Sequence, residues 1–290
     1  SIAPGSVFAQ GSTTVTATAT DPSGNAVSCT FTVTVNDTEA PVVTCPANIS
    51  VSNDAGNCSA VVTFAATASD NCGIASIVEA ASSGSTFAVG TTTVVATATD
   101  IHGNTAACSF TVTVNDTEAP VANCQAVTVQ LDANGAGSIT TADVNNGSSD
   151  NCGIASLSLD NSSFGCANVG NVNTVVLTVT DIHGNSSNCS ATVTVVDNVA
   201  PLAVCQSITV NAPNSGSVSI TASQIDGGSS DACGIASLSV NPNSFSCSNQ
   251  GPNTVTLTVT DVNGNVSSCT ATVTVTSPAI TVSLSSPVNG

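Results

Sequence analysis

The stretch that decides the fold is residues 92–114, TTVVATATDIHGNTAACSFTVTV. Its first eight and last six residues both alternate between apolar side chains and threonine or serine. A period of two is the pattern of a β-strand with one buried face. Between the two runs stands Asp100-Ile101-His102-Gly103-Asn104, and a Gly-Asn turn between alternating runs indicates a β-hairpin. We therefore expect two long antiparallel strands joined by this turn.

Three landmarks recur in step along the chain. The Asp-x-x-Gly-Asn turn begins at Asp21, Asp100, Asp181 and Asp261. Asp-Thr-Glu-Ala-Pro stands at 37–41 and 116–120, with a looser copy at 197–201. Asp-Asn-Cys-Gly stands at 70–73 and 150–153, and Asp-Ala-Cys-Gly at 231–234. Regular spacing of this kind predicts tandem modules of about 80 residues.

The landmarks set the expected domain boundaries. Three complete modules span 37–115, 116–196 and 197–276; residues 1–36 are the second half of a module, and 277–290 are the first strand of a further module or a donor strand. Short strands and turns without helical periodicity predict an all-β fold of immunoglobulin-like β-sandwiches. Short proline-containing junctions predict a linear array of these modules.

The charge balance excludes several functions. The chain has 18 acids, no lysine and no arginine, for a net charge of −18. Without basic residues it has no means of clamping phosphates, so nucleic acid is not an expected partner. Lysine Schiff bases and arginine fingers are also excluded. No Ser, His and Asp trio has the spacing of a nucleophile and its base, and no apolar run approaches 18 residues, so we expect neither an enzyme nor a membrane span.

Thirteen cysteines indicate an oxidising compartment and therefore an extracellular or cell-surface protein. Each complete module has one cysteine in its first strand, one in the Asp-x-Cys-Gly turn and one in its last strand, while the position of the fourth varies. Twelve cysteines are expected to form disulfides: Cys45, Cys58, Cys72, Cys108, Cys124, Cys152, Cys166, Cys189, Cys205, Cys233, Cys247 and Cys269. Cys29 lacks its expected partner within the chain.

The pairing depends on which strands are neighbours. If the first two strands of a module are antiparallel neighbours, the start of one lies near the end of the other. This favours the pairs Cys45–Cys72, Cys58–Cys108, Cys124–Cys152, Cys166–Cys189, Cys205–Cys233 and Cys247–Cys269. The alternative is a bond between Cys152 and Cys166 across a hairpin. Four cysteines allow three pairings, so both remain open.

Several of these motifs together resemble a known family. The module at 37–115 is similar to a hyalin repeat (HYR domain) in Cys45-Pro46, Asp70-Asn71-Cys72-Gly73 and Gly84-Ser85-Thr86-Phe87. The next two modules resemble the variant common in secreted bacterial surface proteins, in which Ala122-Asn123-Cys124-Gln125 or Ala203-Val204-Cys205-Gln206 opens the unit. The resemblance implies an immunoglobulin-like fold, an extracellular adhesive or structural role, and no catalytic residues.

Acidic residues gather at the junctions and turns, where calcium is one expected ligand. Calcium takes six to eight oxygen ligands and is typical of such joints. The candidate ligands are Asp37, Glu39, Asp70, Asp100, Asp116, Glu118, Asp150 and Asp181. The competing interpretation is that each turn aspartate binds its own backbone in an Asx-turn. His102 and His183 share one turn position and are expected to be solvent-exposed rather than ligands.

Nine Asn-x-Ser/Thr sequons raise the question of covalently attached glycans. They begin at Asn36, Asn48, Asn57, Asn115, Asn146, Asn161, Asn185, Asn188 and Asn265. A hydroxyl-rich surface with little charge is also typical of a glycosylated stalk. In a chain this rich in Asn, Ser and Thr, chance matches are the alternative.

These observations predict a structural segment of an extracellular fibre or stalk, with copies of itself or flanking modules as partners. The first alternative is a calcium-dependent adhesin array that presents a binding domain outside this chain. The second is the accessory region of a secreted enzyme. Residues 5–36 match 84–115 at a constant offset, 84 − 5 = 79. Cys29 is therefore expected to bond upstream in a longer array, or the C-terminal strand of one subunit completes this half-module in the next.

Overall fold

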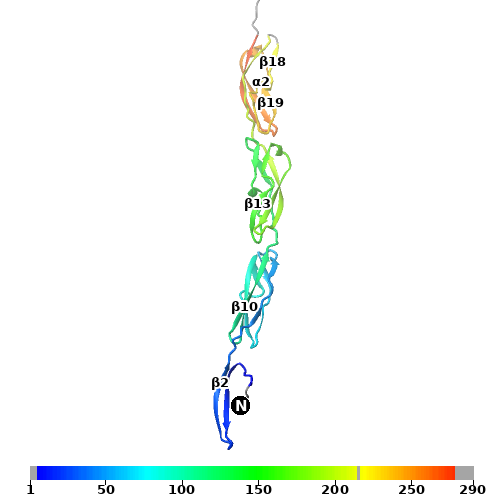
Figure 1. Ribbon diagram of the computed structural model, residues 1–290. Coiled ribbons are helices and arrows are strands. Elements are labelled where there is room, and N and C mark those ends of the chain that lie inside the picture. Colours follow the sequence, from blue (N-terminus) through cyan, green and yellow to red (C-terminus); the bar gives the residue numbers. More distant parts are fainter. Residues whose placement is uncertain (1–4, 214–215, 278–290) are drawn as a thin grey trace, which may run out of the picture. The chain divides into compact units, whose positions relative to one another are not determined.

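A computed structural model describes residues 5–213 and 216–277. The chain divides into two compact units, Ser1–Glu118 and Ala119–Gly290, and β-strands dominate both (Figure 1). Apart from Ser277, the expected first strand of a further module at 277–290 lies outside the described residues. In the described part of the chain, no helix has the length and apolar character needed to cross a membrane.

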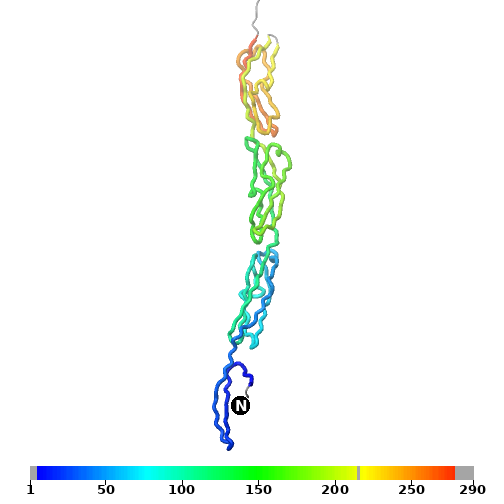
Figure 2. Tube along the Cα trace, in the orientation of Figure 1, coloured from blue at the N-terminus to red at the C-terminus, as the bar shows by residue number. Residues whose placement is uncertain are grey.

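The first unit opens with a hairpin of β1 (Gly11–Thr20) and β2 (Ala26–Val35). The two strands pair antiparallel, with Val15 opposite Phe31 and Ala17 opposite Cys29. Figure 2 traces them in dark blue, side by side along their length. The alternating pattern on either side of the Asp21 turn therefore forms the expected hairpin.

The first complete module is a sandwich of one four-stranded sheet and shorter strand pairs. The sheet order is β4 (Ile49–Ser52), β10 (Thr105–Asn115), β9 (Gly90–Asp100) and β7 (Ile74–Glu79). The shorter pairs are β3 (Val42–Thr44) with β6 (Thr67–Ser69), and β5 (Ser59–Val62) with β8 (Ser85–Ala88). β4 runs parallel to β10, and the other neighbours are antiparallel.

The second unit repeats this strand order twice. One sheet has the order β11 (Val127–Gln130), β16 (Ser186–Val196), β15 (Asn173–Asp181) and β13 (Ile154–Leu159). The other has the order β17 (Ile208–Asn211), β22 (Val266–Thr276), β21 (Gly251–Asp261) and β19 (Ile235–Asn241). The shorter pairs are β12 (Ala136–Ser138) with β14 (Ser163–Gly165), and β18 (Ser217–Ser219) with β20 (Ser244–Ser246). The expected all-β, immunoglobulin-like fold is confirmed.

In the described part of the second unit, four one-turn helices interrupt the strands, and the sequence did not predict them. They are α1 (Thr141–Val144), α2 (Ala222–Ile225) and the 3₁₀ turns η1 (Cys166–Asn168) and η2 (Cys247–Asn249). In α1, the Asp143 carboxylate accepts a 2.7 Å hydrogen bond from the Thr140 backbone N–H. A single turn is too short to show a helical period, so no sequence pattern predicts it.

Alternating residues of the long strands form the cores. In the first complete module, Val94 and Val112 are fully buried, and the Phe64 ring packs edge-on against Phe110 with centroids 5.0 Å apart. In the third module, Val255, Leu257 and Val259 are fully buried on one face of β21. The intervening threonines face outward or lie half-buried, which is the expected division for a two-layer sandwich.

Candidate functional site

Each Asp-x-x-Gly-Asn turn is built around the carboxylate of its aspartate. Asp100 Oδ1 accepts hydrogen bonds from the backbone N–H groups of His102, at 2.8 Å, and Asn104, at 2.9 Å. The Asn104 amide donates to Asp100 Oδ2 at 2.7 Å. Burial raises the pKa of Asp100, but these hydrogen bonds outweigh it and hold the pKa below its usual value. The aspartate therefore forms an Asx-turn, which was one of the two interpretations of these acidic residues.

The same bonds recur at the other turns. The aspartate accepts from the backbone N–H groups two and four residues later, and from the side-chain amide of the asparagine, at Asp21, Asp181 and Asp261. At Asp181, burial again raises the pKa, and the hydrogen bonds led by Asn185 lower it further than burial raises it. The same pattern of hydrogen bonds to an aspartate therefore closes each of these hairpins.

In the first unit, three carboxylates converge at the start of the complete module. Oxygen atoms of Asp37, Asp70 and Asp100 lie within 4.8 Å of one another. Asp70 Oδ1 accepts the N–H groups of Cys72 and Gly73 at 2.7 and 3.1 Å, as Asp100 does in its own turn. Three hard oxygen ligands fit part of the six to eight that calcium takes. The residues present are therefore compatible with calcium completed by water or backbone oxygens.

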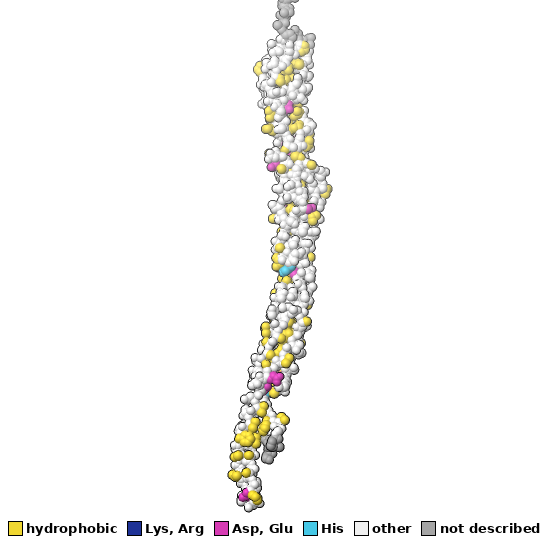
Figure 3. Space-filling model, viewed as in Figure 1, with side chains coloured by type: hydrophobic (Ala, Val, Ile, Leu, Met, Phe, Trp, Pro, Cys, Tyr) yellow, Lys and Arg dark blue, Asp and Glu magenta, His cyan; other side chains and the backbone are white. Residues whose placement is uncertain are grey.

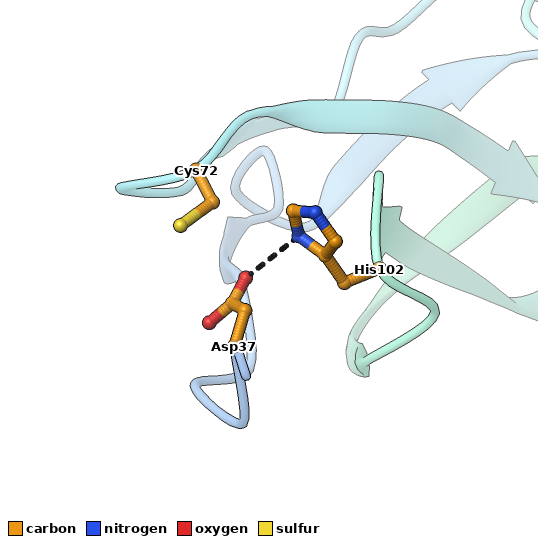
Figure 4. Close-up of side chains that lie close together, drawn as sticks. All are labelled: Asp37, Cys72 and His102. Carbon is orange, nitrogen blue, oxygen red and sulfur yellow. Dashed lines mark hydrogen bonds and ion pairs between the residues drawn. The ribbon is translucent and has the colours of Figure 1, made fainter. Parts of the chain in front are cut away.

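A thiol and an imidazole lie beside the same carboxylates. His102 Nδ1 lies 3.1 Å from Asp37 Oδ2, and ligand atoms of Asp37, Cys72 and His102 lie within 4.8 Å of one another. Figure 4 shows the three side chains converging from three separate segments. Burial raises the pKa of the Cys72 thiol, and its hydrogen bond with Asp37 and the nearby carboxylate charges add to the effect. The thiol is therefore protonated at neutral pH.

The contact between His102 and Asp37 was missed by the sequence reasoning. His102 is exposed, as expected of a turn histidine, yet its ring is held by a carboxylate 65 residues away. No local pattern signals a contact over that separation. Its only trace in the sequence is that the Asp-x-x-Gly-Asn turn and the Asp-Thr-Glu-Ala-Pro junction recur in step.

The other acidic candidates mainly organise local backbone. Glu39 accepts a 2.7 Å hydrogen bond from the Asn71 amide, and Glu118 accepts the Gly56 N–H at 2.8 Å. Asp116 accepts the Glu118 N–H at 3.2 Å. Asp150 accepts the N–H groups of Cys152 and Gly153, and its carboxylate lies within 4.8 Å of that of Asp181. In the third module the corresponding group is Asp197, Asp231 and Cys233.

The disulfide pairing differs from the expected one. The cysteine that was expected in the first strand bonds the cysteine of the last strand in every complete module: Cys45–Cys108, Cys124–Cys189 and Cys205–Cys269. The expected pairs Cys45–Cys72, Cys58–Cys108, Cys124–Cys152, Cys166–Cys189, Cys205–Cys233 and Cys247–Cys269 were therefore wrong. The three bonds observed instead tie the two ends of each module to one another.

The reason for the error is the direction of β4, the strand that follows Cys45. β4 pairs parallel with β10, and Ile49 lies opposite Val112. Cys45 precedes Ile49 by four residues, and Cys108 precedes Val112 by four, so equal offsets in a parallel pair place the two sulfurs side by side. The expected pairing assumed that the first two strands of a module are antiparallel neighbours, but β3 and β4 lie in different sheets and β4 pairs with β10.

A second kind of disulfide joins one module to the next. Within the second unit, Cys166 of η1 bonds Cys233, which belongs to the Asp-Ala-Cys-Gly turn of the following module. The alternative bond between Cys152 and Cys166 is therefore also wrong. Gly135 packs against this link, since a Cβ at Gly135 would lie 2.7 Å from Cys166 Sγ. Cys58 and Cys152 are disulfide-bonded as well.

Among the residues that the structure describes, three cysteines carry free thiols. Cys29 and Cys247 are exposed, and Cys72 is half-buried. Cys72 and Cys247 were expected to be bonded within their modules, and the structure corrects this. Their counterparts in neighbouring modules are Cys233 and Cys166, the two partners of the bond between modules. Both corrections therefore have one cause, which is that this class of cysteine bonds between modules and not within them.

The sequon asparagines fall into two groups. Asn185 and Asn265 are half-buried, and their side-chain amides donate to Asp181 and Asp261 at 2.7 and 2.8 Å. A glycan on either nitrogen would break a turn. The remaining asparagines are exposed: Asn36, Asn48, Asn57, Asn115, Asn146, Asn161 and Asn188.

Comparison with known proteins identifies hyalin-repeat sequence at the start of the chain. Residues 1–35 and 36–114 each match the HYR domain. The two later modules, for which a bacterial variant was expected, lie outside the matched residues. Hyalin of the sea urchin Strongylocentrotus purpuratus is 37% identical over 217 residues, which cover 70% of this chain. The chain spans 18% of the length of that relative.

Solved structures match this chain at low sequence identity and low TM-score. Protocadherin gammaB7 EC3-6 is 15% identical, with 91% of this chain and 85% of that chain covered and a TM-score of 0.34. Drosophila N-cadherin EC1-4 is also 15% identical, with 94% and 85% covered and a TM-score of 0.35. The titin I-band fragment I67-I69 is 10% identical, with 82% and 99% covered and a TM-score of 0.34.

Proposed function

We propose that this chain, whose first 114 residues match the HYR domain, is a structural segment of an extracellular fibre or stalk. Its modules transmit load and set distance, and they catalyse no reaction. Its partners are further modules of the same kind, within one chain or between copies. Hyalin, to which the chain is 37% identical over 217 residues, supports an extracellular adhesive setting.

The observation that carries this proposal is the Cys166–Cys233 bond. This bond joins two consecutive modules, so it removes freedom at the junction between them, in addition to the packing of both cysteines against the core of the second module. Junctions between domains of one chain are otherwise free to move unless the interface is large and apolar. A disulfide that restrains a junction supports a structural function, because such a function depends on consecutive modules that do not move freely against each other.

The composition supports the same function. The chain has no lysine or arginine, so its stability rests on aliphatic strands and disulfides. Removing a native disulfide from a small secreted domain typically costs about 2–5 kcal/mol, which is large against the marginal stability of one domain. Trypsin, which cleaves after lysine or arginine, has no site in it. Such a chain suits durable material outside the cell.

Electron microscopy of the purified full-length chain tests the proposal. We expect particles that are elongated, several times longer than they are wide, and that keep this form in the absence of reducing agent. Compact round particles, with no elongated population at any concentration, would exclude a fibre or stalk segment.

A second candidate, a calcium-dependent adhesin, is favoured by the group of Asp37, Asp70 and Asp100. A cation bound there would cancel the repulsion between three carboxylates at the junction end of the module. Calcium should then raise the unfolding temperature of the chain, and a chelator should lower it. Equal unfolding temperatures with calcium and with chelator would remove this candidate and leave the structural function untouched.

A further inference from the structure

The start of the first complete module holds an imidazole as well as carboxylates. A carboxylate oxygen of Asp37 lies within 4.8 Å of oxygens of both Asp70 and Asp100. The same side chain has the ring of His102 beside it, with Nδ1 3.1 Å from Asp37 Oδ2. Four donor side chains therefore gather around Asp37, three with oxygen atoms and one with nitrogen.

The carboxylates at this place are buried without a fixed positive charge beside them. The side chain of Asp37 is 4% exposed, and Asp100 is 1% exposed. The chain contains no lysine or arginine, and on the face shown in Figure 3 the acidic side chains appear at a few separate places among uncharged ones. His102 supplies at most one positive charge for three carboxylates. Because buried charges in proteins are paired or coordinate metal ions, a bound dication fits this composition.

Hydrogen bonds hold these donors in place. The Asp100 carboxylate accepts the backbone N–H of His102 at 2.8 Å, so this carboxylate and the imidazole belong to one turn. The Asn104 amide of the same turn also donates to the backbone carbonyl of Asp37, at 3.4 Å. Hydrogen bonds of this kind orient the ligands of metal sites in proteins. The turn therefore positions oxygen and nitrogen donors toward the same point.

The donor types and their spacing distinguish between metal ions. Calcium and magnesium take oxygen ligands, whereas imidazole suits transition metals. Two ligand atoms about 2.1 Å from one ion lie about 3.0–3.4 Å apart at the angles of octahedral and tetrahedral coordination. The 3.1 Å between His102 Nδ1 and Asp37 Oδ2 falls in this range. With its proton on Nε2, the ring can therefore share an ion with the carboxylate instead of donating a hydrogen bond to it.

The third module shows the same turn without the imidazole. Asn263 stands at the position of His102, and its backbone N–H donates to Asp261 Oδ1 at 2.9 Å. The group of potential ligands in that module has two aspartates and Cys233, which is disulfide-bonded. Asparagine therefore maintains this turn, so His102→Asn removes the nitrogen donor and keeps the local backbone.

We infer that one divalent first-row transition-metal ion binds at the start of the first complete module, and that its protein ligands are Asp37, Asp70, Asp100 and His102. Water completes the coordination, and the ion ties the junction segment to the two turns. Calcium, the second candidate above, would use the same carboxylates without the imidazole. Cys72 is not counted as a ligand, because Cys233 at the same position of the third module is disulfide-bonded. The inference does not depend on the fibre function.

The first test locates the metal by NMR. It uses the full-length chain with Cys29→Ser, Cys72→Ser and Cys247→Ser, so that no free thiol competes for the ion. The probe is Co²⁺, which is paramagnetic and therefore broadens the signals of nearby residues. We expect the amide signals of residues 100–104 to broaden at a Co²⁺ concentration that leaves those of the matched turn at 261–265 sharp. Equal broadening of both turns, or of neither, would overturn the inference.

The second test separates the imidazole from the carboxylates by adding His102→Asn to the same chain. Loss of an outer-shell partner alone typically weakens metal binding by about 10–100-fold, so loss of this ligand should weaken Co²⁺ binding by at least about tenfold. Any calcium binding, followed by the shifts of the same amides, should be unchanged because calcium takes oxygen ligands. Unchanged Co²⁺ affinity would show that the carboxylates bind without His102, and an equal loss for both ions would show a disturbed turn. Either result would overturn the inference and leave the structural function untouched.

Discussion

Cys166 and Cys233 lie 67 residues apart in sequence and form a disulfide that crosses from one module to the next. Cys166 begins η1 and Cys233 sits in the Asp-Ala-Cys-Gly turn, so neither belongs to the core strands of its module. The bonds Cys124–Cys189 and Cys205–Cys269 lie within the two modules that this link connects. The disulfides therefore divide into those that hold a module and those that hold a junction.

The two classes of disulfide should respond differently to removal. We expect C205S/C269S to lower the free energy of unfolding of the third module by about 2–4 kcal/mol. C166S/C233S should instead leave the strand pairing of both modules intact, because neither cysteine lies in a core strand, and make the junction near 197–200 more sensitive to thermolysin. Calorimetry and timed proteolysis measure the two effects. If C166S/C233S left junction cleavage unchanged, the bond would have no role in restraining the junction.

Two glycines with similar backbone conformations allow the packing around the Cys166–Cys233 bond to be tested separately from backbone strain. Gly135 and Gly147 both adopt positive φ, +72° and +74°, but only at Gly135 would a Cβ meet Cys166 Sγ, at 2.7 Å. Gly147→Ala should cost about 1–2 kcal/mol for the left-handed backbone alone. Gly135→Ala should cost more and should also raise the fraction of free thiol at Cys166 and Cys233. Equal unfolding free energies and equal free thiol in the two variants would contradict this packing.

Because hydrogen bonds hold the pKa of turn aspartates low in the folded state, we expect the chain to lose stability in acid. Hydrogen bonds hold the pKa of Asp181 below its usual value, so the folded chain binds this proton less readily than the unfolded chain does. Its contribution is complete above the unfolded pKa of about 3.9 and disappears as pH falls through the lower folded pKa. Asp181→Asn and Asn185→Ala should each flatten the dependence of unfolding free energy on pH below about 4. Urea unfolding from pH 7 to pH 2 measures this, and an unchanged slope in both variants would contradict it.

Calcium binding at the first module can be separated from turn stability by two equivalent substitutions. Asp70 and Asp231 accept the same two backbone hydrogen bonds, from the cysteine and glycine that follow. Asp70 has two further aspartates within 4.8 Å, whereas Asp231 is grouped with Asp197 and a disulfide-bonded cysteine. Asp70→Asn should abolish any calcium-dependent rise in unfolding temperature, and Asp231→Asn should not. Equal responses in both variants would count against this site.

The hairpins and the fold class could be predicted from the sequence because their signals are local. The Asp100 turn and the alternation on either side of it fix which residues pair and which face is buried. The disulfides could not be predicted, because alternation looks the same in a parallel and an antiparallel neighbour. Only the pairing of Ile49 with Val112 shows that Cys45 lies beside Cys108.

The candidate site was predictable in its residues but not in its arrangement. Asp37, Asp70 and Asp100 were recognised as oxygen ligands, and the structure brings them together. Glu39 was proposed with them, but its carboxylate binds the Asn71 amide instead. Because each complete module has four cysteines, all four were expected to bond within the module. The bond from Cys166 to the following module was therefore not predicted.

Small-angle X-ray scattering of the non-reduced full-length chain tests the central claim most directly. A compact chain of 290 residues would have a radius of gyration of about 19 Å. Strands of 11 residues make each module about 37 Å long, so three modules in line span about 110 Å and give a radius of gyration of about 32 Å. For an extended segment we expect a radius of gyration of about 30 Å or more. A value near 19 Å would contradict a structural segment that extends a fibre or stalk.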